Sequence, residues 1–213
     1  MKRIFLGQLI LLLMLSGGAR AATLVGSVTD LTGGGGALGP ISLDLVIDTE
    51  ADKVTMTMSG PAAGWFGVGF DPLMQGMSGG PYSIIADSSG VFEQDLGPFS
   101  GGSAVPTVAI FGVSDTTSGS TRTVSVMRQI AASYTGGITD PDPFTFPSAP
   151  DVLNLVWAQS PGSTFSFHGS SSSGRAGRAS INLSAVPLPP AALLFVPAFA
   201  GLIWSKRRRA VAT

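Results

Sequence analysis

The sequence predicts an all-β protein, specifically an antiparallel immunoglobulin-like β-sandwich of about ten strands. Three observations lead to this prediction. Short apolar or alternating segments recur along the middle of the chain, Gly-, Pro- and Ser-rich stretches separate them, and no segment there keeps a helical period. Because the sequence also lacks an internal repeat, the series of short strands favours a sandwich over a repeat architecture.

The expected strands follow one another with turn-forming residues between them. They are Thr23–Thr29, Ile41–Asp48, Val54–Met58, Trp65–Phe70, Tyr82–Ala86, Thr107–Val113, Arg122–Ile130, Val152–Ala158, Thr164–His168 and Ala179–Leu183. Residues 50–52 should join the second and third strands into a hairpin, and residues 115–120 the sixth and seventh. Val54, Met56 and Met58 alternate with threonine or serine, which predicts core positions for them.

The N-terminal segment 1–21 reads as a secretory signal peptide. Lys2 and Arg3 precede an apolar run, and Ala19-Arg20-Ala21 forms a small-residue cleavage site, so the mature chain should begin at Ala22. The sequence contains no cysteine. Disulfides, thiolate metal sites and covalent c-type haem attachment are therefore excluded.

The C-terminal segment 186–213 has three parts, a Val-Pro-Leu-Pro-Pro start, the apolar run Ala191–Trp204 and a basic cluster at Lys206–Arg209. The apolar run alone is shorter than the ~20 residues that cross a bilayer comfortably, so with the preceding segment it predicts a marginal transmembrane helix. This tail resembles the PEP-CTERM sorting signals of the VPLPA type. The resemblance implies transient anchoring in the inner membrane, processing by an exosortase-type protease, and a final place at the surface or in the matrix of a Gram-negative-type cell.

The region between these ends is acidic. Five of the 12 Lys and Arg and all 13 Asp and Glu lie within 22–185, which gives that region a net charge of about −8. Nucleic acid is not an expected partner for such a chain.

The most informative stretch is Gly64–Ala86, an aromatic strand followed by a loop and a second apolar strand. In Trp65–Phe70 bulky residues alternate with glycine, so one side of the strand should let another group approach the backbone closely. Met74 and Met77 lie on the Gly-rich loop that follows. Because His168 is the only histidine, a six-coordinate b-type haem could be held only by this histidine and a methionine, and the residues alone leave open which one.

Five stretches in order resemble the DOMON family, the haem- or sugar-binding domain of cellobiose dehydrogenase cytochromes and dopamine monooxygenase relatives. They are GWFGVGF, MSGGPYSIIA, RTVSVMRQI, VLNLVWAQ and FSFHGSSSSGRAGRASINL, and together they span roughly 41–183. The resemblance implies a DOMON-like domain at 22–185 that binds haem b through Met77 and His168, with Met74 as the fallback ligand. It also suggests Trp65 as part of the cofactor site, and Arg175 and Arg178 as partners of the haem propionates.

The implied function is an exported module for electron transfer or redox sensing with a redox partner protein, and not an enzyme on its own. An alternative is a domain without haem that binds sugar, such as an extracellular polysaccharide, through Trp65 or Trp157, although burial in the core is the favoured role of each tryptophan. A purely structural matrix protein is a further alternative. Gly76–Gly80 also matches a hydrolase nucleophile motif centred on Ser78, but no helix is expected after it.

Overall fold

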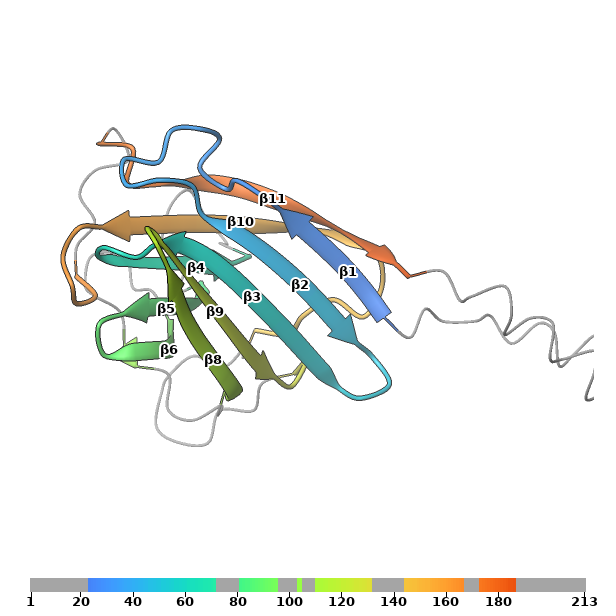
Figure 1. The fold of residues 1–213 in the computed structure, drawn as a ribbon. Helices are drawn as coiled ribbons and strands as arrows, with labels where there is room; N and C mark the ends of the chain where they lie inside the picture. The colour runs from blue at the N-terminus through green and yellow to red at the C-terminus, as the bar shows by residue number, and fades with distance from the viewer. Residues whose placement is uncertain are drawn as a thin grey trace, which may run out of the picture. The chain divides into compact units, whose positions relative to one another are not determined.

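The computed structural model describes residues 23–71, 81–95, 103–104, 110–131, 144–166 and 173–186, and they form eleven β-strands (Figure 1). The strands are β1 (Thr23–Val28), β2 (Ser42–Asp48), β3 (Lys53–Pro61), β4 (Trp65–Phe70), β5 (Tyr82–Asp87), β6 (Gly90–Asp95), β7 (Ser103–Ala104), β8 (Phe111–Ser118), β9 (Thr121–Arg128), β10 (Asp151–Ser160) and β11 (Ala176–Ala185). Every pairing between them is antiparallel. The all-β, antiparallel part of the sequence prediction is therefore confirmed.

The strands form one nearly closed sheet in the order β7-β6-β5-β4-β10-β11-β1-β2-β3-β9-β8. The sheet bends where β11 passes to β1, since these two strands pair at only Leu24↔Ala185 and Val25↔Ser184. As a result β1, β2, β3, β9 and β8 lie over β10, β4, β5 and β6 (Figure 1). At the far side Arg122 Nη1 on β9 donates to the Asp87 carbonyl on β5 at 2.8 Å, which links the two halves of the sheet.

The core lies between these two halves of the sheet, and strands such as β2, β3 and β9 contribute alternate residues to it. From β2 and β3 it takes Leu43, Leu45, Ile47, Val54, Met56 and Met58, all at most 1% exposed. From β4 it takes Phe66, Val68 and Phe70, which are fully buried. The core positions predicted for Val54, Met56 and Met58 are thus confirmed, because the period of two in the sequence matches the pleat of the sheet.

The hairpin predicted around residues 50–52 is also confirmed. Strands β2 and β3 pair from Ser42↔Ser59 to Asp48↔Lys53. Asp48 Oδ1 accepts hydrogen bonds from the backbone N–H groups of Glu50 and Ala51 at 3.1 and 2.9 Å, and Asp52 has a positive φ of 48°. Two aspartates therefore close the hairpin. Asp48 accepts hydrogen bonds from the backbone of the turn, and Asp52 tolerates the left-handed backbone conformation.

Two predicted elements differ from the structure. The turn expected over 115–120 is confined to residues 119–120, because Thr116 and Thr117 continue β8 and pair with Thr123 and Arg122. The strand expected at Thr164–His168 is absent in its described part, 164–166. There the Phe165 N–H donates to the Asp87 carboxylate at 2.9 Å instead of joining a strand ladder.

Residues 22–185 form one compact unit. The predicted signal peptide at 1–21 and, apart from Val186, the predicted sorting segment at 186–213 with its expected hydrophobic helix lie outside the described residues. In the part of the chain that is described, no helix has both the length and the hydropathy to cross a bilayer.

Candidate functional site

The sequence pointed to Trp65, Met74, Met77, His168, Arg175 and Arg178 as candidate site residues. Trp65, Arg175 and Arg178 are described by the structure, whereas the two methionines and His168 lie outside the described residues, as does Ser78. The site is therefore built from the strands that lead into the segments 72–80 and 167–172.

Strand β4 has two buried sides of different character, as the alternation of bulk and glycine predicted. Phe66, Val68 and Phe70 enter the core, while Trp65, Gly67 and Gly69 form the opposite side, and all six residues are buried. A methyl group added at Gly69 would lie 2.7 Å from Ser83 Oγ and 2.8 Å from Val156 Cγ2. The groups that approach the β4 backbone closely are thus side chains of its neighbours β5 and β10.

The side of the sheet that carries Trp65 is called the second face below. Trp65, Ile85 and Ala158 form a buried cluster there, and Phe92, Phe165 and Ala176 pack against it. The rings of Trp65 and Phe165 meet edge to face, with centroids 4.9 Å apart. Because Val156 and Ser160 on this face are only 6% exposed, the part of the second face along β4 is a buried, largely apolar wall, whereas the same side of β11 is exposed at Arg178.

Segments 72–80 and 167–172 leave this wall from opposite ends. Strands β4 and β10 pair antiparallel, from Leu155↔Phe70 to Ser160↔Trp65. The segment with the methionines follows Phe70, and the segment with His168 follows residues 161–166 at the Trp65 end. Five residue steps of a strand separate these ends by roughly 17 Å. The described residues that flank the two segments on β4 and β10 therefore mark the two ends of the second face.

Arg178 lies on the second face, whereas Arg175 lies before the start of β11. Arg178 pairs with Val156 in the register of β10 and β11, and cross-strand partners share a face of the sheet. Its side chain is exposed. Arg175 precedes β11 and is half-buried, and its carbonyl accepts the Gln159 N–H at 2.8 Å. Of the two arginines, Arg178 is the better placed for an acidic group at the rim of the wall.

Asp87 fixes the chain that leads toward His168. Its Oδ1 accepts from the backbone N–H and the hydroxyl of Ser89 at 2.7 and 2.6 Å, and its Oδ2 accepts from the Phe165 N–H at 2.9 Å. Burial alone would raise the pKa of the Asp87 carboxyl, but the hydrogen bonds from Ser89 and Phe165 and the charge of Arg122 outweigh it and lower that pKa. The ionised carboxylate thus holds Phe165 against Trp65.

Replacing Asp87 with asparagine should lower the free energy of unfolding by about 2–3 kcal/mol at neutral pH, because hydrogen bonds to a charged acceptor are lost. The lowered pKa means that this contribution is present above the unfolded-state pKa of about 3.9 and is lost as the pH falls through the folded-state value. Urea unfolding at several pH values should show the gap between wild type and Asp87→Asn closing below about pH 4. Asp151→Asn, at an exposed position of β10, serves as the control. A gap that stays constant down to pH 2.5 would contradict the assignment.

A buried polar cluster, which the sequence patterns did not predict, lies at the Phe70 end of the core. The Tyr82 hydroxyl donates to Glu93 Oε1 at 2.5 Å, and the guanidinium carbon of Arg128 stands 4.2 Å from the Tyr82 ring centroid. Arg128 is fully buried, and its Nε and Nη2 donate to the carbonyls of Gln129 and Phe144 at 2.9 and 2.7 Å. Its Nη1 has no hydrogen-bond partner among the described residues.

Burial raises the pKa of the Tyr82 phenol well above its usual range, and the nearby Glu93 carboxylate adds to this shift while Arg128 opposes it. Tyr82 therefore stays protonated and acts as a hydrogen-bond donor. The sequence held one signal for this cluster, since Arg128 falls on the same side of β9 as the buried Val124 and Val126. Arginine is usually exposed, which is why the alternation alone did not indicate a buried charge.

Two further features of the structure bear on sugar binding and on metal binding. Trp157 is 6% exposed and Trp65 is 1% exposed, so neither presents an open ring face on which a sugar could stack. The favoured burial of both tryptophans is confirmed, with Trp157 on the core side of β10 and Trp65 in the cluster on the second face. Among the described residues no group of three or more His, Cys, Asp or Glu side chains could hold a metal ion.

Comparison of the chain with protein-family models found no match, and comparison with curated proteins found none. The functional conclusions below therefore rest on the sequence patterns and on the geometry of the described residues.

Proposed function

We propose that the chain is an exported, DOMON-like module that binds one b-type haem and serves extracellular electron transfer or redox sensing. In this proposal the nearly closed sheet is an immunoglobulin-like sandwich of the DOMON kind. Segments 1–21 and 186–213 direct export and exosortase-dependent sorting. The module then acts with a redox partner protein at the cell surface or in the extracellular matrix.

The observation that carries the proposal is the buried cluster on the second face, at whose two ends the chain continues in sequence into residues 72–80 and 167–172. A low-spin haem iron takes its two axial ligands from opposite sides, and a Met-His pair is the only usual choice in a chain with one histidine and no cysteine. Met77 lies in the segment that leaves β4 at Phe70, and His168 in the segment that leaves at the Trp65 end.

The described residues fit the surroundings that a haem needs. Trp65, Ile85 and Ala158, which Phe92, Phe165 and Ala176 already cover, would be a packed apolar layer beneath the haem and not a surface that it touches. The exposed Arg178 on the same face can pair with a propionate. When bound, the haem iron would accept and release one electron. Asp87 would support the site by holding Phe165, three residues before His168, in place.

Addition of haemin to the purified protein should give a one-to-one complex with a shifted Soret band. Met77→Ala and His168→Ala should each change the spectrum, because each removes one axial ligand, and loss of the methionine should also lower the reduction potential. Met74→Ala is the matched control, since it removes a methionine three residues away on the same segment and should leave the spectrum unchanged.

Absence of a Soret shift, or a shift that is unchanged in both ligand variants, would exclude the haem proposal. A change in Met74→Ala with none in Met77→Ala would transfer the ligand role to Met74.

A further inference from the structure

Strand β8 is a free edge of the sheet. It comes last in the order of the strands, and among the described residues its backbone pairs only with β9. An edge strand leaves a row of N–H and C=O groups unpaired, and these groups can pair with a strand of another chain. The other edge of the sheet, β7, has only two residues, so β8 is by far the longer template.

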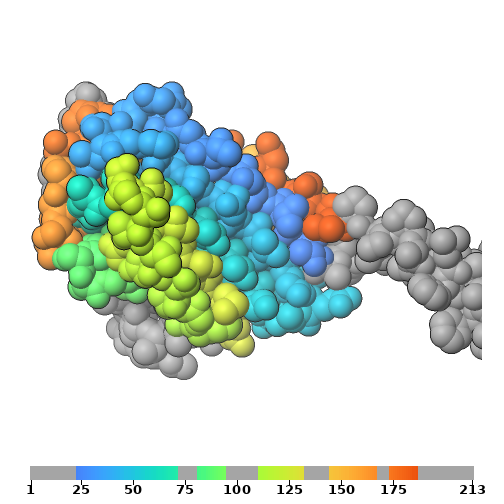
Figure 2. Space-filling view, viewed as in Figure 1, coloured from blue at the N-terminus to red at the C-terminus, as the bar shows by residue number. Residues whose placement is uncertain are grey.

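This edge is open to solvent on both sides of the sheet. All eight residues of β8 are exposed. Val124 on β9 faces the core and is 1% exposed, whereas Asp115, its partner on β8, is exposed on the same side. The core therefore ends at β9 and β8 extends beyond it, as the yellow-green strand at the front of Figure 2 shows.

The free edge lacks most of the features that keep edge strands apart. Such strands usually carry lysine, proline or an unpaired charge. Strand β8 has neither lysine nor proline, and its one charged residue, Asp115, accepts hydrogen bonds from Nε and Nη2 of Arg122 at 3.0 and 2.6 Å. Its bulge is confined to the step between Phe111 and Ser114, so residues 114–118 pair regularly with β9.

Strand β8 also exposes two large apolar side chains. Phe111 is 44% exposed and Val113 is 49% exposed. The other large apolar side chains that are exposed in the described part of the chain are Val46, Val152 and Val186, each on a different segment. A partner at this edge would therefore bury apolar surface in addition to pairing with the backbone.

The regular part of β8 is complementary to itself. A two-fold axis at Thr116 places this residue opposite Thr116 of a second copy. Ser114 then lies opposite Ser118 of that copy, and Asp115 lies opposite Thr117. Paired hydroxyl side chains stabilise antiparallel strands, and this register places no like charges directly opposite each other. Pairing of the same edge in both copies also closes at two copies and leaves no free template.

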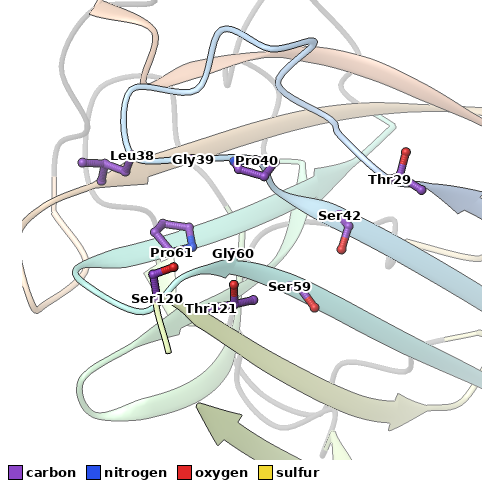
Figure 3. A pocket seen from close by; sticks show the side chains of 10 residues that line it. All are labelled: Thr29, Leu38, Gly39, Pro40, Ser42, Ser59, Gly60, Pro61, Ser120 and Thr121. Atoms are coloured by element: carbon purple, nitrogen blue, oxygen red, sulfur yellow. The ribbon is translucent and has the colours of Figure 1, made fainter. Parts of the chain in front are cut away.

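The same register brings Phe111 and Val113 beside the turn at residues 119–120 of the second copy. Ser120 and Thr121 line a hollow of about 170 Å³ together with residues that include Leu38 and Pro61 (Figure 3). The residues that line this hollow are uncharged. The apolar end of one β8 thus meets a neutral and partly apolar part of the other copy.

We propose that β8 pairs antiparallel with β8 of a second copy about a two-fold axis at Thr116, so that two sheets join into one in a dimer. Each copy of the region 22–185 carries a net charge of about −8, but repulsion between distant charges is screened beyond about 8 Å at physiological salt. The dimer uses none of the candidate haem residues and goes beyond the proposed electron-transfer function. Dimer formation and haem binding can therefore succeed or fail separately.

Cysteine cross-linking tests this register, because the chain has no cysteine of its own. Directly opposed residues of antiparallel strands have Cα atoms about 4.5–5.5 Å apart, within the range that a disulfide bridges. Oxidation of purified full-length Thr116→Cys with copper phenanthroline should therefore give a disulfide-linked dimer at least about tenfold faster than oxidation of Ser180→Cys. Ser180 is the matched control, since it is exposed on β11, an interior strand.

Two further variants test the register and the pairing itself. The two-fold axis separates the two copies of residue 114 by roughly 14 Å, so Ser114→Cys should cross-link as slowly as Ser180→Cys. Thr116→Lys places two lysines opposite each other and should weaken association about tenfold or more in sedimentation experiments, whereas Ser180→Lys should not. Because these positions are exposed, all variants should keep the wild-type melting temperature within a few degrees.

The proposal is overturned if Thr116→Cys cross-links no faster than Ser180→Cys, or if Ser114→Cys cross-links as fast as Thr116→Cys. It is also overturned if Thr116→Lys associates as tightly as the wild type. Association through the terminal segments would affect all variants alike and would give one of these results.

Discussion

Replacing Arg128 with alanine should lower the free energy of unfolding by about 3 kcal/mol or more. The guanidinium is fully buried, it donates to the carbonyls of Gln129 and Phe144, and it lies over the rings of Tyr82 and Phe146 at 4.2 and 5.1 Å. Alanine would leave two carbonyls without donors and a cavity beside the rings. A domain of this size has a total stability of only about 5–15 kcal/mol, so the variant should be markedly less stable.

Two companion variants separate the contributions of Arg128. Arg128→Met fills most of the space but makes no hydrogen bonds and should cost about 1–2 kcal/mol. Arg122→Ala removes the other arginine of β9, which forms a partly exposed ion pair with Asp115 at 2.6 Å, and should cost about 1 kcal/mol. Urea unfolding followed by tryptophan fluorescence measures all three. If Arg128→Met is more stable than the wild type, the cost of burying the charge exceeds what its contacts contribute.

The sequence predicted best those strands whose two sides differ. In β2 and β3 apolar residues enter the core and polar residues face away, so the period of two revealed both strands and the Met56 and Met58 positions. Strand β6 was not predicted, because Gly90–Asp95 has no alternation and contains Glu93, Gln94 and Asp95. Its pairing with β5 depends on tertiary contacts, such as the hydrogen bond from Tyr82 to Glu93, that local propensity does not encode.

The sequence also indicated part of the candidate site. The glycines of β4 predicted a side where other groups approach closely, and the structure identifies those groups as Ser83 and Val156. The contact of Asp87 with Phe165 was not predictable, because it joins residues 78 positions apart through one side chain. That long-range hydrogen bond replaces the expected strand at Thr164–His168 and thereby sets where the segment with His168 begins.

Replacing Gly64 with alanine should be among the most destabilising single changes in the domain, at about 4 kcal/mol or more. Gly64 precedes β4 and has a φ of 103°, a region that alanine rarely adopts. An added methyl group would also lie 2.0 Å from the carbonyl oxygen of Ser160 and 3.0 Å from Pro161 Cα. Because both of these are backbone atoms, either β4 or the end of β10 must shift, and the Trp65↔Ser160 pair would be disturbed.

Gly90→Ala is the matched control for Gly64→Ala, since Gly90 has a φ of 130° and nothing lies within 4 Å of the added methyl group. It should cost only about 1–2 kcal/mol, from backbone strain alone. The difference between the two variants in urea unfolding then measures the clash with Ser160. Gly64→Ala should also change the fluorescence emission of Trp65, because Trp65 packs against Phe165 in the wild type. Gly90→Ala should leave that emission unchanged. Equal costs for the two variants would mean that β10 yields easily at Ser160. The Trp65 end of the second face would then not be the rigid wall on which the haem proposal depends.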